Sequence, residues 1–162
     1  MDAKSKVYDL VSSFSTTMLV THGPGRRPES RPMQVAAAEK DGNIWFFAGQ
    51  HGRVVDELAH DSNVLLVFQD ERSKYLSIRG SARVVNDRVK AKQLFTEGYR
   101  VWFPGGLDDP ELALVAVEPF DAEYWDNTGV NKLQYMFESA KAYAKGERPR
   151  VEEPEQHAKV AL

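Results

Sequence analysis

The apolar residues of this chain recur with two spacings, one typical of helices and the other typical of strands. In three segments, 4–14, 52–60 and 133–144, they recur every three or four positions, which predicts amphipathic helices that each bury one face. A further helix is predicted over 86–95, where a polar residue at its start can cap the first turn. The last helix is expected to stop at Gly146, because glycine readily adopts the left-handed conformation that ends a helix.

Strands are predicted between these helices. In 75–84 every second residue is apolar, which places one face of a long strand in a core and leaves the other face free. Other strands are expected over 16–21, 33–38, 44–48, 64–68, 112–117 and 122–125. The Asp41-Gly42 pair predicts a hairpin over 32–48. Successive strands with tight turns favour an antiparallel sheet closed into a small barrel, in a mainly β (α+β) fold with flanking helices.

The length and composition fit a single domain. A chain of 162 residues with 42% hydrophobic residues can bury one core, which we assign to residues 1–146; residues 147–162 lack periodicity and are expected to form an extended tail. The absence of cysteine excludes a disulfide framework and a cysteine nucleophile. A net charge of -3 disfavours a nucleic-acid partner. The sequence shows no signal peptide and no membrane-length apolar run, so a cytoplasmic location without a membrane partner is expected.

Charge is distributed unevenly along the chain. Residues 70–92 hold seven basic and three acidic residues, whereas 105–126 hold seven acidic residues and no basic one. An anionic ligand is expected to prefer the first region. Two solvated faces of opposite sign would give the same counts, so the pattern alone does not select between these interpretations.

Candidate catalytic residues are few. The four histidines lack a metal-ligand spacing, and there is no Gly-x-Ser-x-Gly motif, so we expect no metal and assign no general acid or base. One arrangement is suggestive: Gly52 and Arg53 begin a predicted helix just after an aromatic strand that includes Phe47 and Ala48. A helix start with an arginine suits a phosphate, and a flat ring could lie along the strand edges. Core aromatics beside a surface arginine would produce the same pattern.

At these residues the sequence resembles the pyridoxamine 5'-phosphate oxidase-like FMN-binding split-barrel family, in its general stress protein branch. The resemblance covers about residues 5–162 and is carried by the segments 17–21, 30–33, 41–47, 75–82, 86–88, 102–106, 109–110 and 123–126. It implies a six-stranded antiparallel split β-barrel, a homodimer, and FMN bound in a cleft between the subunits. The implied activity is that of a flavin-dependent oxidoreductase.

The resemblance also implies a set of cofactor-binding residues. Arg31, Pro32 and Met33 would contact the isoalloxazine through their backbone; Phe47, Ala48, Gly52 and Arg53 would hold ribityl and phosphate; Ser77 would assist from its strand, and Trp102 would come from the other subunit. Ala48, Gly52 and Val54 replace the Thr, Ser and Lys that are usual in the family, so Arg53 alone remains among the phosphate-binding side chains. Backbone N–H groups could compensate, and Gly52 would let a phosphate approach closely.

Two functions therefore stay open. The first is an FMN-binding, flavin-dependent oxidoreductase of the general stress type. The second is a split-barrel dimer that has lost its FMN affinity and acts as a binding or interaction module, or takes another flat cofactor such as a deazaflavin or haem. Pyridoxamine 5'-phosphate oxidation itself is not expected, because the resemblance implies that this activity needs further basic residues near the C-terminus to bind the substrate phosphate. From residue 145 onward, four basic residues are balanced by four acidic ones.

Overall fold

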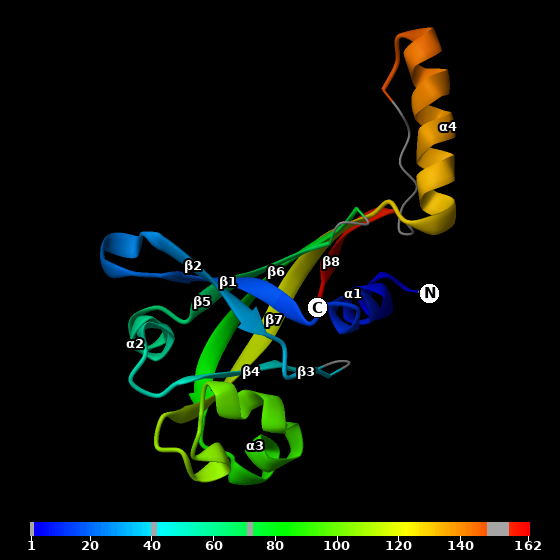
Figure 1. Cartoon of the computed structure of the whole chain (residues 1–162). Coiled ribbons are helices and arrows are strands. Elements are labelled where there is room, and N and C mark those ends of the chain that lie inside the picture. Colours follow the sequence, from blue (N-terminus) through cyan, green and yellow to red (C-terminus); the bar gives the residue numbers. More distant parts are fainter. Residues whose placement is uncertain (1, 40–41, 71–72, 149–155) are drawn as a thin grey trace.

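The computed structural model of the chain describes residues 2–39, 42–70, 73–148 and 156–162. Its elements are, in chain order, α1 (Ala3–Ser12), β1 (Thr16–His22), η1 (Pro24–Arg26), β2 (Pro28–Gln34), β3 (Ala37–Ala38), β4 (Ile44–Gly49), α2 (Arg53–His60), β5 (Asn63–Gln69), β6 (Lys74–Val85), α3 (Arg88–Leu94), η2 (Glu97–Val101), η3 (Gly106–Asp108), β7 (Leu112–Asp126), α4 (Gly129–Lys145) and β8 (His157–Ala161). Figure 1 shows a strongly curved sheet with short helices around it and α4 standing apart. None of the described helices is long and apolar enough to cross a membrane.

The sheet is antiparallel throughout its described pairings. Its strand order is β2-β1-β5-β6-β7-β4-β3, and β8 lies beside β7. The long strand β7 pairs with β6 over most of its length, with β4 along its first half and with β8 along its second half. The mainly β fold predicted from the sequence, with an antiparallel sheet closed into a small split barrel, is confirmed in its class and strand direction, and the sheet has the form of a half-barrel. The described residues form eight strands rather than six, because the short β3 and the C-terminal β8 join the sheet.

The hairpin predicted over 32–48 is only partly correct. Met33 pairs with Thr17 of β1, so the first part of this segment belongs to β2. The chain then changes partner, because the N–H of Ala36 donates to the carbonyl oxygen of Trp45 at 2.8 Å, and β3 continues beside β4. The tip of the hairpin lies outside the described residues. An apolar pattern predicts extended backbone but does not say which neighbouring strand will be the partner.

The segments 112–117 and 122–125, predicted as separate strands, belong to one strand, β7. Pro119 lies inside that strand, at the point where the register with β6 shifts beside Gly80 and leaves Phe120 without a partner on β6. Such a shift is a β-bulge, and a bulge tolerates proline because one ladder hydrogen bond is already missing there. The proline therefore bends the strand without ending it.

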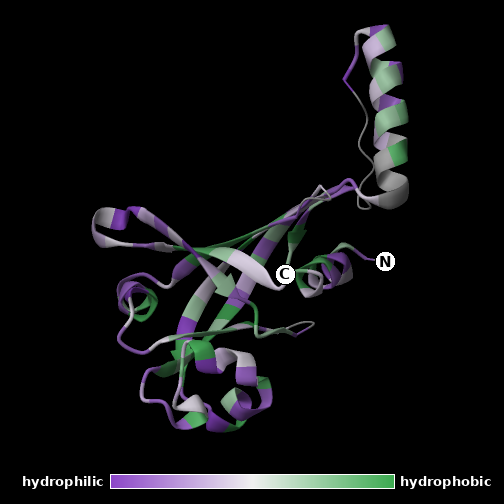
Figure 2. Cartoon of the chain, viewed as in Figure 1, coloured by the Kyte–Doolittle hydropathy of each residue, from purple (hydrophilic) through white to green (hydrophobic). Residues whose placement is uncertain are grey.

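The hydrophobic core has two parts, on opposite faces of β4. Ile44, Phe46 and Ala48 face the interior of the half-barrel, where they join the main cluster with α1 and the central strands. Trp45 and Phe47 face the other way, into a second cluster formed with α3, η2 and β7. Figure 2 shows hydrophobic and hydrophilic residues alternating along much of β6, as expected when one face is buried. The first part of β7, residues 112–117, is hydrophobic throughout, because its two faces are buried in the two clusters.

The C-terminal part differs from the tail that was expected for residues 147–162. The helix α4 ends as predicted at Gly146, whose φ is 66°. Residues 149–155 lie outside the described residues. The chain is back at the sheet by Gln156, whose carbonyl oxygen accepts a hydrogen bond from the N–H of Asp126 at 2.7 Å. Residues 157–161 then form β8 against β7, so the end of the chain is part of the sheet.

Candidate functional site

The basic segment 70–92 and the acidic segment 105–126 lie side by side rather than as separate faces. Three ion pairs connect them: Arg79 with Asp121 at 2.8 Å, Arg83 with Glu118 at 3.9 Å, and Arg88 with Asp108. The first two follow from the pairing of β6 with β7, and the third connects α3 with η3. The expectation that an anion would prefer residues 70–92 is therefore not supported, because much of this positive charge is paired within the chain.

Two of the predicted site residues lie in one row across the outer face of the sheet. Pro32 of β2 is opposite Met18 of β1, Met18 is opposite Val67 of β5, and Val67 is opposite Ser77 of β6. We call these four residues the outer strip. Pro32 is exposed, Met18 and Val67 are 38% and 36% exposed, and Ser77 is half-buried. The strip spans four neighbouring strands, roughly 14 Å at about 4.8 Å per strand spacing.

The neighbours of Pro32 on β2 point to the opposite face. Met33 packs against the main hydrophobic cluster, and Arg31 reaches the buried carboxylate of Glu57. This is the alternation expected of a strand, so the three consecutive residues cannot all present side chains to one ligand. β2 pairs only with β1 among the described strands, so its other backbone edge is available for a ligand.

Glu57 of α2 is the centre of a buried polar network. One carboxylate oxygen accepts hydrogen bonds from the hydroxyl of Thr21 and, at 2.6 Å, from Nη2 of Arg31; Nη1 of Arg31 also donates to Thr21. Burial by itself raises the pKa of Glu57, but the hydrogen bonds from Thr21 and Arg31 outweigh it and hold the pKa below its ordinary value. The carboxylate is therefore charged at neutral pH.

The start of α2 carries the predicted phosphate residues Gly52 and Arg53. Gly52 caps the helix without a side chain, and a Cβ there would lie 3.1 Å from the carbonyl oxygen of Gly49, so the tight turn favours glycine over the serine usual in the family. The guanidinium of Arg53 is 72% exposed; its Nη2 lies 3.2 Å from Oε2 of Glu29 and 3.5 Å from Oε1 of Glu57. Arg53 is thus shared between two carboxylates.

The other predicted contacts are distributed over separate parts of the molecule. The ring of Phe47 lies 4.7 Å from that of Tyr99 and 5.9 Å from that of Phe95, so its side chain belongs to the second cluster and only its backbone can reach a ligand. Ala48 is buried in the main cluster. Trp102 follows η2 and is 74% exposed, which leaves it accessible to a second copy of the chain.

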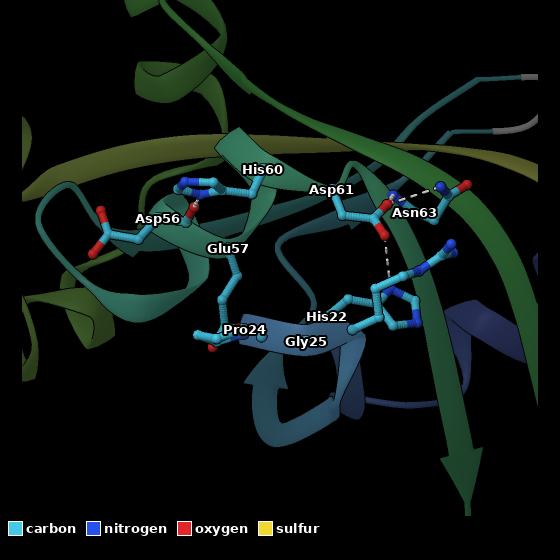
Figure 3. A pocket seen from close by; sticks show the side chains of 10 residues that line it. His22, Pro24, Gly25, Asp56, Glu57, His60, Asp61 and Asn63 are labelled. Atoms are coloured by element: carbon cyan, nitrogen blue, oxygen red, sulfur yellow. Dashed lines mark hydrogen bonds and ion pairs between the residues drawn. The ribbon is translucent and has the colours of Figure 1, made fainter.

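A hollow of about 740 Å³ lies between the β1–β2 turn and α2 (Figure 3). His22 and Asp61 approach each other there, with 3.5 Å between Nδ1 and Oδ2, while His60 contacts the carbonyl oxygen of Asp56 at 2.8 Å. A second hollow of about 480 Å³ adjoins β1, β5 and β6. None of the nine predicted site residues lines either hollow. No group of three metal-ligating side chains occurs among the described residues.

Sequence reasoning missed Glu29 and Glu57, the carboxylates that meet the predicted arginines. One signal was present, because Arg53 and Glu57 are four residues apart on a predicted helix, a spacing that favours an ion pair. Nothing in the sequence pattern indicated Glu29, since its contact with α2 exists only in the folded chain.

Comparison with known proteins agrees with this fold. A general stress protein 26 from Jannaschia sp. CCS1 is 24% identical, with 99% of this chain and 98% of that chain covered and a TM-score of 0.74. A general stress family protein from Xanthomonas campestris pv. campestris is 29% identical, with 80% and 92% covered and a TM-score of 0.67. The general stress FMN/FAD binding protein of Xanthomonas citri is 26% identical, with 78% and 89% covered and a TM-score of 0.65.

No curated protein matches the sequence. The family model described as pyridoxamine 5'-phosphate oxidase like, however, matches residues 2–150, which is most of the chain. This match agrees with the curved antiparallel sheet and with the general stress proteins among the similar structures. The chain therefore belongs to the pyridoxamine 5'-phosphate oxidase like family.

Proposed function

We propose that this protein binds a flavin on the outer face of its sheet, between two copies of the chain, and acts as a flavin-dependent oxidoreductase. The observation that carries the proposal is the outer strip, where Pro32 and Ser77 flank the apolar side chains of Met18 and Val67. Family membership and the similar FMN/FAD binding protein of Xanthomonas citri support it.

The strip suits a planar ring system in shape and chemistry. Met18 and Val67 offer an apolar surface to the ring, and the hydroxyl of Ser77 can hydrogen-bond a polar ring edge. The free backbone edge of β2 lies beside Pro32 and supplies further donors and acceptors. A second copy of the chain laid over this face would cover the ring and exclude water from it.

The ring end of FMN fits these residues, but the phosphate end does not. Arg53, the sole remaining side chain of the family's phosphate set, contacts the carboxylates of Glu29 and Glu57. Ala48 and Val54 carry no hydrogen-bond donor in their side chains. The chain's own part in the reaction is accordingly to hold and orient the ring, with Pro32 and Ser77 at either end of the strip.

A bound flavin would supply hydride or electron transfer, chemistry that no protein side chain provides. We assign no general acid or base to the chain. The residues of the strip position the ring and limit solvent access, and these tasks depend on shape and burial rather than on a titrating group.

The test is a titration of the purified protein with riboflavin and with FMN, in which binding is measured by the quenching of flavin fluorescence. Binding of either flavin supports the proposal. Ser77→Phe should weaken it by at least about tenfold, because the bulky ring occupies the strip. Ser12→Phe, on the exposed surface of α1, should leave it unchanged.

Absence of binding by both flavins at high micromolar concentration would contradict the proposal. It would instead favour the second function considered from the sequence, a split-barrel dimer that no longer binds a flavin. Unchanged binding in Ser77→Phe would show that the ring lies elsewhere.

A further inference from the structure

The charged side chains at the start of α2 disfavour the binding of a phosphate. Two guanidinium groups, Arg31 and Arg53, lie among three carboxylates, Glu29, Asp56 and Glu57. Asp56 stands in the first turn of α2, where it already complements the positive end of the helix dipole. Arg26 and Asp61, which line the adjoining hollow with Asp56 and Glu57, add one charge of each sign. The excess charge that a phosphate dianion would meet at this end of the site is therefore negative.

Each guanidinium has a carboxylate partner supplied by the fold. Arg31 is held by the buried Glu57 at 2.6 Å, and Arg53 bridges Glu57 to Glu29 on β2. The imidazole of His51, just before the helix, is likewise paired with Glu111, at 2.6 Å between Nδ1 and Oε1. A phosphate would have to displace Glu29 or lie beside it, and like charges at that range repel.

Backbone N–H groups at this turn compensate only in part for the missing phosphate-binding side chains. The N–H of Gly52 donates to the carbonyl oxygen of Gly49 at 2.9 Å, so that amide is already used in the turn. The space left by the missing side chain of Gly52 is filled by the turn itself, because a Cβ there would lie 3.1 Å from the carbonyl oxygen of Gly49. Gly52 therefore serves the local backbone geometry.

These observations point to one conclusion about specificity. Resting on the function proposed above, we propose that the flavin site selects against the phosphate, so that riboflavin binds at least as tightly as FMN, with Glu29 as the specificity-determining residue. Glu29 and Arg31 lie on the face of β2 opposite Pro32, so a phosphate would reach the start of α2 past the free edge of β2, and the outer strip, which contains no charged group, is unaffected. The ribityl hydroxyls can still hydrogen-bond the polar groups that line the start of α2.

The experiment compares the two dissociation constants, for riboflavin and FMN, in the wild-type protein and in Glu29→Gln. In the wild type FMN should bind no tighter than riboflavin. Glu29→Gln should improve FMN binding by about three- to fivefold, the effect of removing one partly exposed charge, and leave riboflavin binding unchanged. Glu118→Gln, which removes a carboxylate from the exposed pair with Arg83, is the matched control and should change neither constant.

Salt gives an independent readout. Raising the ionic strength screens repulsion between the carboxylates and the phosphate, so the FMN constant should improve relative to that of riboflavin. A cationic phosphate site would show the opposite trend.

The outcomes separate this inference from the function on which it rests. Wild-type protein that binds FMN measurably tighter than riboflavin, as a charge-assisted phosphate contact would require, would overturn the inference and leave flavin binding intact. An equal response of both flavins to Glu29→Gln would also overturn it. Failure of both flavins to bind would overturn the proposed function, and the inference with it.

Discussion

At the scale of single residues, the buried carboxylate of Glu57 connects three segments of the chain. It joins α2 to β1 through Thr21 and to β2 through Arg31, and its side chain is only 8% exposed. A buried ion pair does not by itself raise stability over an apolar pair, but removing one partner leaves the other uncompensated. The network therefore fixes the position of α2 against β2, and with it the positions of Arg53 and Glu29.

Glu57→Gln should lower the free energy of unfolding by about 3 kcal/mol, because Arg31 keeps a neutral hydrogen-bond acceptor but loses its counter-charge. For a chain of this size that corresponds to roughly 6–12 °C in melting temperature, which thermal unfolding followed by circular dichroism measures. Glu118→Gln, on an exposed pair, should cost less than about 1 kcal/mol. Equal melting temperatures for the two variants would show that the buried network contributes no more to stability than an exposed ion pair.

The pH dependence of stability should change in the same variant. The pKa of Glu57 lies below its ordinary value of 4.5, so its contribution is present above that value and is lost as the pH falls through the lowered pKa. The stability difference between the wild type and Glu57→Gln should accordingly be constant from pH 6 to pH 5 and shrink below about pH 4. Urea unfolding at a series of pH values measures it; a difference that stays constant into acid would contradict the assigned charge state.

At the scale of elements, the long antiparallel pair of β6 and β7 supports the whole sheet. β7 has β6 on one side and β4, then β8, on the other, so an error in its register would displace three neighbouring strands. The register is set at the bulge, where Gly80 lies against the carbonyl oxygen of Glu118. A Cβ on Gly80 would lie 2.5 Å from that oxygen, closer than any side-chain carbon tolerates.

Gly80→Ala should therefore destabilise the protein by about 3 kcal/mol, at the upper end of the cost of overpacking, because a backbone group must move. Chemical denaturation provides the measurement. Gly98→Ala is the matched control: its Cβ would lie 3.7 Å from the Thr96 hydroxyl, an ordinary contact, and its effect should stay within about 0.5 kcal/mol. A Gly80 variant as stable as the Gly98 variant would mean that the bulge rearranges freely.

At the scale of the whole molecule, the outer face of the sheet stays partly uncovered in a single chain. Met18, Val67, Tyr75 and Trp125, all on strands of this sheet, are between 36% and 39% exposed. An apolar surface of this kind on a stable domain is usually covered by a partner. The proposed partner is a second copy of the chain, which would close the flavin strip from above and bring the exposed Trp102 of one copy within reach of the other.

Val67→Lys should accordingly shift the protein from dimer to monomer, because the ammonium group would be buried in the interface without a counter-charge. Sedimentation velocity at micromolar concentration measures the change. Val89→Lys, at a 70% exposed position on α3, should leave the dimer intact. A wild-type protein that sediments as a monomer would rule out the proposed interface, and so would a Val67→Lys dimer.

Much of the fold follows from the spacing of apolar residues. The helices ending at Gly146 and His60 and the alternating strand β6 are recognisable without tertiary information, because each buries one face and shows a regular period. Partner choice is not recognisable in this way. Met33 pairs with β1 rather than continuing toward β4, and β8 joins the sheet although its segment shows no distinct pattern.

The same distinction applies to the residues of the candidate site. The resemblance of the sequence to the family supplies the candidate cofactor-binding residues. The structure places two of them, Pro32 and Ser77, in the same outer strip. It places Phe47 and Ala48 in the two hydrophobic clusters, on opposite faces of one strand. The arginines could be named from the sequence, whereas their carboxylate partner on β2 could not.

The sequence by itself determined which segments are helical or extended, the family, and the loss of the hydroxyl and ammonium groups at Ala48, Gly52 and Val54. These properties depend on local spacing and residue identity. Tertiary structure alone decided that the basic and acidic segments neutralise each other across β6 and β7, and that Glu29 meets Arg53. Electrostatic energy depends on distance through space, and residues far apart in the chain acquire that distance only on folding.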